Sequence, residues 1–137
     1  MPEYVVQRTM EALNSRCKAV KGSKILLLGL AYKANVDDMR ESPTFTLMDR
    51  FQELGASVEF HDPHVPIIGP TREHMAWAGK KSLDWTPENL ASQDAIVIAT
   101  HHAAFDLHEL TANADLIIDT RNAMASVGCK AGQVVKA

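Results

Sequence analysis

Three basic side chains in this sequence have the type and the placement to bind an anion. Lys33 and Arg40 lie in the segment LLLGLAYKANVDDMRESP (residues 26–43), between an apolar run and a Ser-Pro pair. Arg121 lies in IIDTRN (residues 117–122), directly after another apolar run. Arginine binds phosphate through two parallel hydrogen bonds and lysine acts as a point charge, so the three cations favour a phosphate or diphosphate ligand.

Each of these cations also has an ordinary structural interpretation. Lys33 and Arg40 would also fit as solvated surface charges, and Arg121 would also fit as the partner of Asp119 in a structural ion pair. Asp37 and Asp38, between the two basic residues, are candidates for general bases or metal ligands. Orienting Arg40 and capping turns is the commoner role of such side chains.

The overall charge excludes broad electrostatic binding surfaces. The formal net charge of the 137 residues is −3, with 46% apolar and 23% charged residues, as in an ordinary globular protein. We therefore expect neither nucleic acid nor an anionic membrane as a partner. There is no apolar run of roughly 20 residues and no signal-peptide pattern near the N-terminus, and we expect a cytoplasmic protein.

Other kinds of site are weakly supported. His61, His64, His101 and His102 do not have a metal-ligand spacing, so we expect loop histidines and no metal. Cys17 and Cys129 form no C-x-x-C motif, which indicates reduced, inert thiols in place of a disulfide or a nucleophile.

The hydrophobic pattern alternates between helices and strands. Continuous apolar runs predict central strands, periodic apolar residues predict helices, and Pro-containing starts mark helix N-termini. The expected helices are 3–19, 43–54, 72–80, 86–92 and 102–111, and the expected strands are 24–30, 57–61, 94–100 and 114–122, with a possible edge strand at 133–137. This order predicts an α/β fold: a Rossmann-like three-layer sandwich with a mainly parallel sheet, preceded by an N-terminal helix.

Ligands of such sheets bind beyond the carboxyl ends of the strands. The residues expected there are 29–40, His61 and Asp62, 100–102, and 119–122. The first of these loops is a changed dinucleotide fingerprint, because Ala31 and Ala34 stand where G-x-G-x-x-G would have its later glycines. Gly29 either ends its strand or allows backbone to approach a ligand, and the loop does not look like a usual NAD site.

Several segments together resemble one known family. GLAYKANVDDMRESP (29–43), GASVEFHDPHVP (55–66) and IIDTRNAM (117–124) closely resemble the C-terminal domain of the UDP-glucose/GDP-mannose dehydrogenase family. MPEYVVQRTMEALN (1–14) resembles the end of the central helical segment that precedes that domain. The first motif is most similar to the UDP-N-acetylglucosamine 6-dehydrogenase branch. The resemblance implies that residues 1–20 end a connecting and dimerising helix and that residues 21–137 form the UDP-sugar-binding domain.

The resemblance also implies a reaction. Family members oxidise the C6 alcohol of a nucleotide sugar to a carboxylate with two NAD⁺, and the UDP-N-acetylglucosamine branch makes uronic acids for surface polysaccharides. An N-terminal domain holds NAD, a catalytic cysteine lies in a glycine-rich motif, and the full-length enzymes dimerise. This sequence contains neither the full fingerprint nor that cysteine motif, so we expect no turnover by this chain alone and assign it no catalytic residue.

By the same resemblance, individual residues receive roles. Lys33 matches the lysine that contacts the nucleotide sugar, Arg40 an arginine that reaches the NAD pyrophosphate, and Arg121 an arginine near the UDP end of the substrate. Gly29 and Tyr32 are expected to serve backbone approach and packing at the substrate. The alternatives are a free-standing nucleotide-binding or interaction module and, less well supported, a phosphatase or response-regulator-like domain that uses Asp37 and Asp38.

Overall fold

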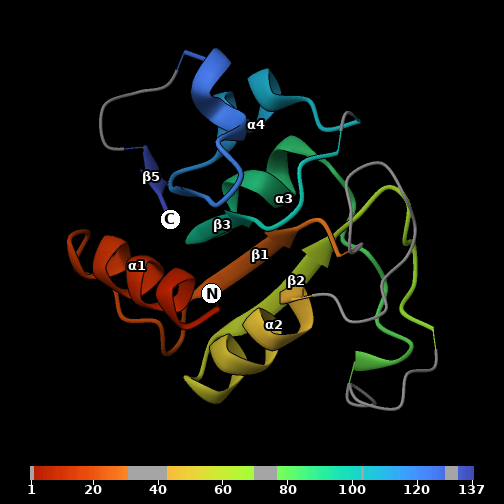
Figure 1. Cartoon of the computed structure of the whole chain (residues 1–137), viewed down its shortest axis with the longest axis horizontal. Coiled ribbons are helices and arrows are strands. Elements are labelled where there is room, and N and C mark those ends of the chain that lie inside the picture. Colours follow the sequence, from red (N-terminus) through yellow and green to blue (C-terminus); the bar gives the residue numbers. More distant parts are fainter. Residues whose placement is uncertain (1, 31–42, 70–76, 103, 129–132) are drawn as a thin grey trace.

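A single parallel sheet forms the centre of the molecule (Figure 1). The structure is a computed structural model that describes residues 2–30, 43–69, 77–102, 104–128 and 133–137. The sheet has the order β2-β1-β3-β4-β5, and every neighbouring pair is parallel. Its strands are β1 (Lys24–Leu28), β2 (Ser57–His61), β3 (Ala95–Ile98), β4 (Ile117–Asp119) and β5 (Val134–Lys136).

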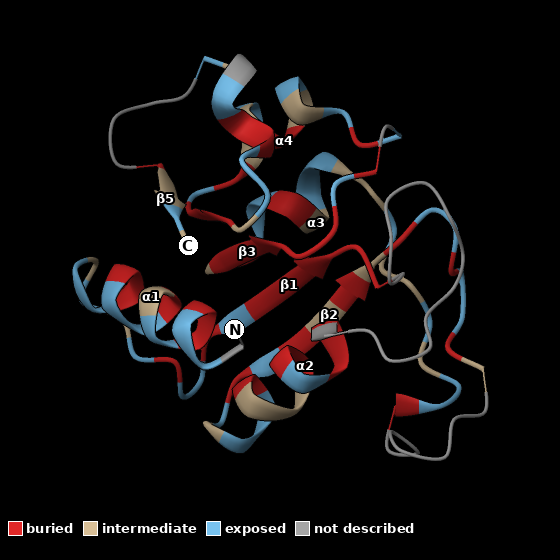
Figure 2. Ribbon diagram, viewed as in Figure 1, coloured by how far each residue is buried: buried red, intermediate tan, exposed pale blue. Residues whose placement is uncertain are grey.

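Helices cover both faces of this sheet, which confirms the predicted α/β sandwich (Figure 1). One face packs on α1 (Pro2–Asn14) and α2 (Pro43–Glu53), and the other on α3 (Pro87–Ala91) and α4 (Leu107–Asn113). Successive side chains of a strand point to opposite faces, so β1 contributes to two separate hydrophobic clusters. Figure 2 shows the central strands as almost continuously buried, as their apolar runs predict.

The short helices begin at side-chain caps. Thr86 accepts a hydrogen bond from the backbone N–H of Asn89 at the start of α3, and Pro87 is the first helical residue, as predicted. The prediction for α4 was wrong at its start, since the helix begins at Leu107 and not at residue 102. Asp106 is its cap and accepts the backbone N–H of Glu109.

The buried side of α1 includes one polar residue. Val6 and Leu13 are buried, Met10 is exposed, and the buried stripe runs through Thr9. Thr9 is tolerated there because its hydroxyl donates a 2.8 Å hydrogen bond to the carbonyl of Val5. Tyr4 and Met10 are left as the large apolar side chains that α1 exposes.

Between β2 and α3 the structure describes residues 62–69 and 77–86. The predicted helix at 72–80 falls largely outside the described residues, as does Cys129. Trp77 is buried, and its indole N–H donates to the Asp49 carboxylate of α2 at 2.7 Å, which holds the segment against that helix. Ile67 and Lys81 form an isolated antiparallel bridge. None of the helices in the described ranges has the length and hydropathy needed to cross a bilayer.

Candidate functional site at the carboxyl ends of the strands

The order of the strands places the predicted binding edge beside β1 and β3. The chain passes from β1 to β2 on one side and then to β3 on the other, so the connections diverge between β1 and β3. Such a divergence leaves a crevice at the carboxyl ends of the strands. Gly29 and Thr100 meet there, directly after the two strands. The residues that the sequence predicts for this edge lie along it, wherever the structure describes them.

Gly29 has a packing requirement that only glycine meets. Its φ is +91°, and a β-carbon would lie 2.5 Å from the Cβ of Thr100. Its N–H donates to the His61 carbonyl at 2.8 Å, and its carbonyl accepts the Thr44 hydroxyl at 3.0 Å. A side chain at position 29 would therefore collide with Thr100, and both the positive φ and this close approach require glycine.

Asp62 joins the ends of three strands. Its side chain is fully buried and accepts hydrogen bonds from the backbone N–H of Leu30 at 2.7 Å and of His64 at 2.7 Å. It also accepts the Nε2–H of His102, at 2.9 Å. Because a carboxylate only accepts, Nε2 of His102 carries the hydrogen. The contacts hold the residues that follow β1, β2 and β3 in a fixed arrangement.

His61, His64 and His102 belong to an aromatic cluster. His64 and His102 lie edge to face with centroids 4.7 Å apart, and His61 lies 5.2 Å from Trp85. The Nδ1–H of His61 donates to the Leu83 carbonyl at 2.7 Å. Burial lowers the pKa of His61 and outweighs the opposing effects of that bond and of nearby aspartates. The described part of the chain contains no group of three or more metal-ligating side chains.

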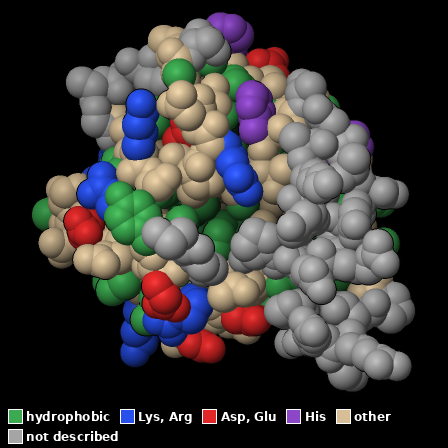
Figure 3. All heavy atoms as spheres, in the orientation of Figure 1, with side chains coloured by type: hydrophobic (Ala, Val, Ile, Leu, Met, Phe, Trp, Pro, Cys, Tyr) green, Lys and Arg blue, Asp and Glu red, His purple; other side chains and the backbone are tan. Residues whose placement is uncertain are grey.

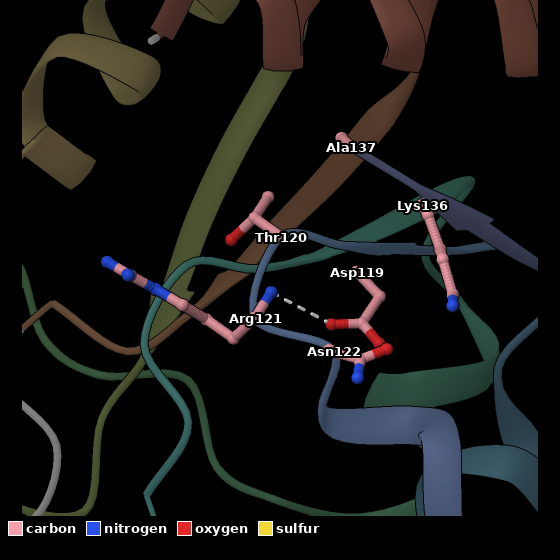
Figure 4. Close-up of a pocket in the computed structure, with 6 residues that line it drawn as sticks. All are labelled: Asp119, Thr120, Arg121, Asn122, Lys136 and Ala137. Carbon is pink, nitrogen blue, oxygen red and sulfur yellow. Dashed lines mark hydrogen bonds between the residues drawn. The ribbon is translucent and has the colours of Figure 1, made fainter.

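An open pocket of about 550 Å³ lies where β4 and β5 end (Figure 4). It is lined by Asp119, Thr120, Arg121, Asn122, Lys136 and Ala137. The first four of these residues were predicted for this edge from the sequence. Lys136 was not, because its position depends on the pairing of β5 with β4. In Figure 3 the described Lys and Arg side chains are scattered over the visible face, several beside acidic ones. The described part of this face therefore shows no continuous basic patch.

Arg121 is held by the backbone and not by a carboxylate. Its Nε–H donates to the carbonyl of Ala99 at 2.9 Å, and Figure 4 shows its guanidinium pointing away from the Asp119 carboxylate. Asp119 instead accepts backbone N–H groups, including that of Arg121 at 3.0 Å. The alternative of a structural Arg121–Asp119 ion pair is therefore wrong. The exposed guanidinium has the position that a phosphate-binding group at this edge needs.

The remaining candidates lie in a segment that the structure does not describe. Tyr32, Lys33 and Arg40 fall within residues 31–42, as do Asp37 and Asp38. Leu30, the last described residue before this segment, is buried and is held to Asp62. The roles assigned to Tyr32, Lys33 and Arg40 remain predictions.

Comparison with known proteins identifies relatives of the chain. The family model of the UDP-glucose/GDP-mannose dehydrogenase family, UDP binding domain, matches residues 26–126. A UDP-N-acetyl-D-mannosamine dehydrogenase of Methanococcus maripaludis is 30% identical over 99% of this chain and 31% of its own length. The UDP-glucose 6-dehydrogenase YwqF of Bacillus subtilis is 35% identical over 82% of this chain and 26% of its own length.

Solved structures agree with this relationship. The NDP-N-acetyl-D-galactosaminuronic acid dehydrogenase of Methanosarcina mazei superimposes with a TM-score of 0.76 at 29% identity, over 99% of this chain and 28% of that one. A UDP-D-ManNAc dehydrogenase of Pyrococcus horikoshii shares the fold, with a TM-score of 0.76 at 24% identity, over 98% of this chain and 30% of that one. The chain thus spans less than a third of the length of these relatives. With its parallel sheet and the matched residues 26–126, the chain belongs to the UDP-glucose/GDP-mannose dehydrogenase family, through the UDP binding domain of that family.

Proposed function

We propose that the chain is the UDP-sugar-binding domain of an NAD-dependent nucleotide-sugar 6-dehydrogenase. The reaction would oxidise the C6 alcohol of a UDP-hexose to a uronic acid for surface polysaccharide, in the cytoplasm. The observation that carries the proposal is the family match over residues 26–126 together with Arg121, which the fold presents beside an open pocket at the ligand-binding edge. A UDP-binding domain needs such a group for the diphosphate.

The chemistry of Arg121 suits a diphosphate. One of the five guanidinium N–H donors is used by Ala99, and the side chain is exposed. A planar fork of donors can bind two oxygens of a phosphate at once. Lys136 also lines the pocket, but its amino group points away from the Arg121 guanidinium (Figure 4).

The other assignments rest on the family resemblance. Lys33, Tyr32 and Gly29 would contact or pack against the nucleotide sugar, and Arg40 would reach the NAD pyrophosphate. NAD itself would be held mainly by an N-terminal domain, which supplies the hydride acceptor. The partners would be the N-terminal and central domains of the same enzyme, with residues 1–20 as the end of the central helix and residues 21–137 as this domain, in a homodimer.

The sugar is the least constrained part of the proposal. The first motif favours UDP-N-acetylglucosamine, with UDP-glucose as the second candidate. The names of the relatives include UDP-N-acetyl-D-mannosamine and UDP-glucose, so they do not single out one sugar. Comparing the two candidate UDP-sugars as substrates of the full-length enzyme would distinguish them.

Calorimetric titration of the 137-residue chain with UDP, UDP-N-acetylglucosamine and uridine tests the proposal. We expect weak binding of both nucleotides and clearly weaker binding of uridine, because the diphosphate would meet Arg121. Equal affinity for UDP and uridine, or no binding of UDP, would reject the proposed site. In the full-length enzyme, Lys33→Ala should raise KM or lower kcat, and wild-type kinetics would remove Lys33 from the site.

A further inference from the structure

Asp119 is a buried carboxylate whose hydrogen bonds all go to the loop that follows it. It is the last residue of β4 and is 2% exposed. One oxygen accepts the backbone N–H groups of Arg121 and Ala123, both at 3.0 Å, and the other accepts that of Met124 at 2.9 Å. Among the described residues, the Asp119 carboxylate makes no hydrogen bond besides these three. The carboxylate therefore folds the loop around itself.

The loop also needs an unusual backbone conformation. Asn122 has φ +56° and ψ +28°, in the left-handed region, and precedes a short 3-10 helix at Ala123–Ser126. The side chain of Asn122 makes no capping bond to that helix, and Asp119 satisfies the free N–H groups at its start instead. The turn at 119–123 is thus specified by a side chain that does not itself reach solvent.

Arg121 is attached at two points as a result. Asp119 holds its backbone N–H (Figure 4), and Ala99 accepts its side-chain Nε–H at 2.9 Å. The neighbouring Thr120 hydroxyl donates to the Ile98 carbonyl, which joins the loop to β3. A long side chain that is fixed before the ligand arrives loses less entropy on binding.

We propose that Asp119 is a positioning residue, which holds Arg121 in the geometry that binds the diphosphate. The inference rests on the proposed function of this site. Asp119 acts through Arg121 and need not touch the ligand. A carboxylate is required because all three partners are N–H donors. In asparagine, the amide nitrogen would face at least one of these donors in either orientation of the amide.

The first test needs no ligand. In the wild-type chain, NMR should show the Nε–H of Arg121 protected from exchange by its bond to Ala99. Asp119→Asn should lose that protection. The matched control is Asp94→Asn, since Asp94 also accepts a backbone N–H, that of Lys24 at 2.8 Å, but at the opposite end of the sheet. A protected Nε–H in Asp119→Asn would overturn the proposal.

The second test is a double-mutant cycle measured as affinity for UDP. Asp119→Asn should weaken UDP binding about tenfold, with little effect on uridine. In an Arg121→Ala background the same substitution should have almost no further effect, because its target is gone. Additive losses, or an equal loss for uridine, would show a general structural role and overturn the proposal.

A second pair of variants covers the case in which Asp119→Asn fails to fold. Asn122→Ala and Asn122→Gly remove the same exposed amide, but only glycine adopts a positive φ without strain. Asn122→Ala should therefore weaken UDP binding relative to Asn122→Gly, and equal affinities would contradict the proposal. If wild-type protein bound no UDP while Asp119→Asn lost the Arg121 signal, the proposed function would fail and Asp119 would still organise this arginine.

Discussion

The carbonyl of Ala99, just beyond β3, accepts a 2.9 Å hydrogen bond from the Nε–H of Arg121, which follows β4. The bond connects the loops of two adjacent parallel strands and directs an exposed guanidinium along the edge of the sheet where ligands of such folds bind. It makes Arg121 the best-defined cation of the predicted site.

Two substitutions of Arg121 should weaken UDP binding to different extents. Arg121→Ala should lower the affinity about 10- to 100-fold, the range for a lost charge-assisted hydrogen bond. Arg121→Lys should recover only part of it, because lysine has no Nε–H for Ala99 and no planar fork. Arg16→Ala is the control, since Arg16 pairs with Asp115 away from the pocket. Calorimetry measures all three, and a full-affinity Arg121→Ala variant would contradict the assignment.

Gly29→Ala should destabilise the fold more than an alanine at another glycine of similar backbone angle. Gly79 has φ +86°, and a β-carbon added there would have no atom within 4 Å, whereas a β-carbon on Gly29 would meet Thr100 at 2.5 Å. The backbone strain should cost about 1–2 kcal/mol in both variants. Overpacking against Thr100 should add about 1–3 kcal/mol at Gly29 alone.

Urea unfolding of the two glycine variants gives the comparison. Equal losses at Gly29 and Gly79 would mean that Thr100 moves aside without cost. The backbone of Gly29 would then be open to a ligand, as the resemblance to a dinucleotide fingerprint first allowed.

Breaking the contacts of Asp62 should be among the most destabilising single changes in the described chain. Asp62→Ala leaves the buried N–H groups of Leu30 and His64 and the ring of His102 without this acceptor, at a cost of about 3–5 kcal/mol. Glu3→Ala is a useful contrast, because Glu3 pairs with Arg50 at the surface and should cost less than about 1 kcal/mol. Chemical denaturation checks both, and similar losses would refute the role of Asp62 at the edge of the sheet.

His61 should make the fold less stable in mild acid. Burial lowers its pKa in the folded state below the ordinary value of about 6.5. The folded protein therefore favours the neutral ring, and stability that is present above about pH 6.5 is lost as the pH falls through the lowered pKa. His61→Asn, which can keep a donor to the Leu83 carbonyl, should reduce this loss. The measurement is the free energy of unfolding at about pH 7.5 and about pH 5.5.

The control for this pH dependence is the exposed His101. His101→Asn should leave the difference between the two pH values as it is in the wild-type chain. If His61→Asn also left it unchanged, another group would be responsible for the acid sensitivity.

The central strands were predictable because their physical cause is local. β1 and β3 are continuous apolar runs, and buried parallel strands require such runs. The start of α4 was missed although the sequence carries a signal for it. Asp106 and Glu109 have the spacing of a helix cap, a signal that the predicted start at residue 102 did not use.

The position of the site on the sheet could be predicted from the sequence, but the contacts of its residues could not. The ends of the strands place Arg121 at the edge of the sheet, yet its bond to Ala99 depends on long-range packing. The bonds of Asp119 include a local one, to the N–H two residues later, and this turn pattern is typical of aspartate. Lys136 could not be assigned, because nothing local shows that a three-residue edge strand pairs with β4.

Mapping UDP onto the chain by amide NMR tests the central claim most directly. During a titration of the wild-type protein with UDP, we predict that the largest shift changes cluster at residues 119–122, at Gly29 and Leu30, and in the segment 31–41. Residues at the opposite end of the sheet, such as Lys24 and Asp94, should change little. Shift changes that avoid residues 119–122, or that spread evenly over the molecule, would contradict the assignment of this edge as the UDP site.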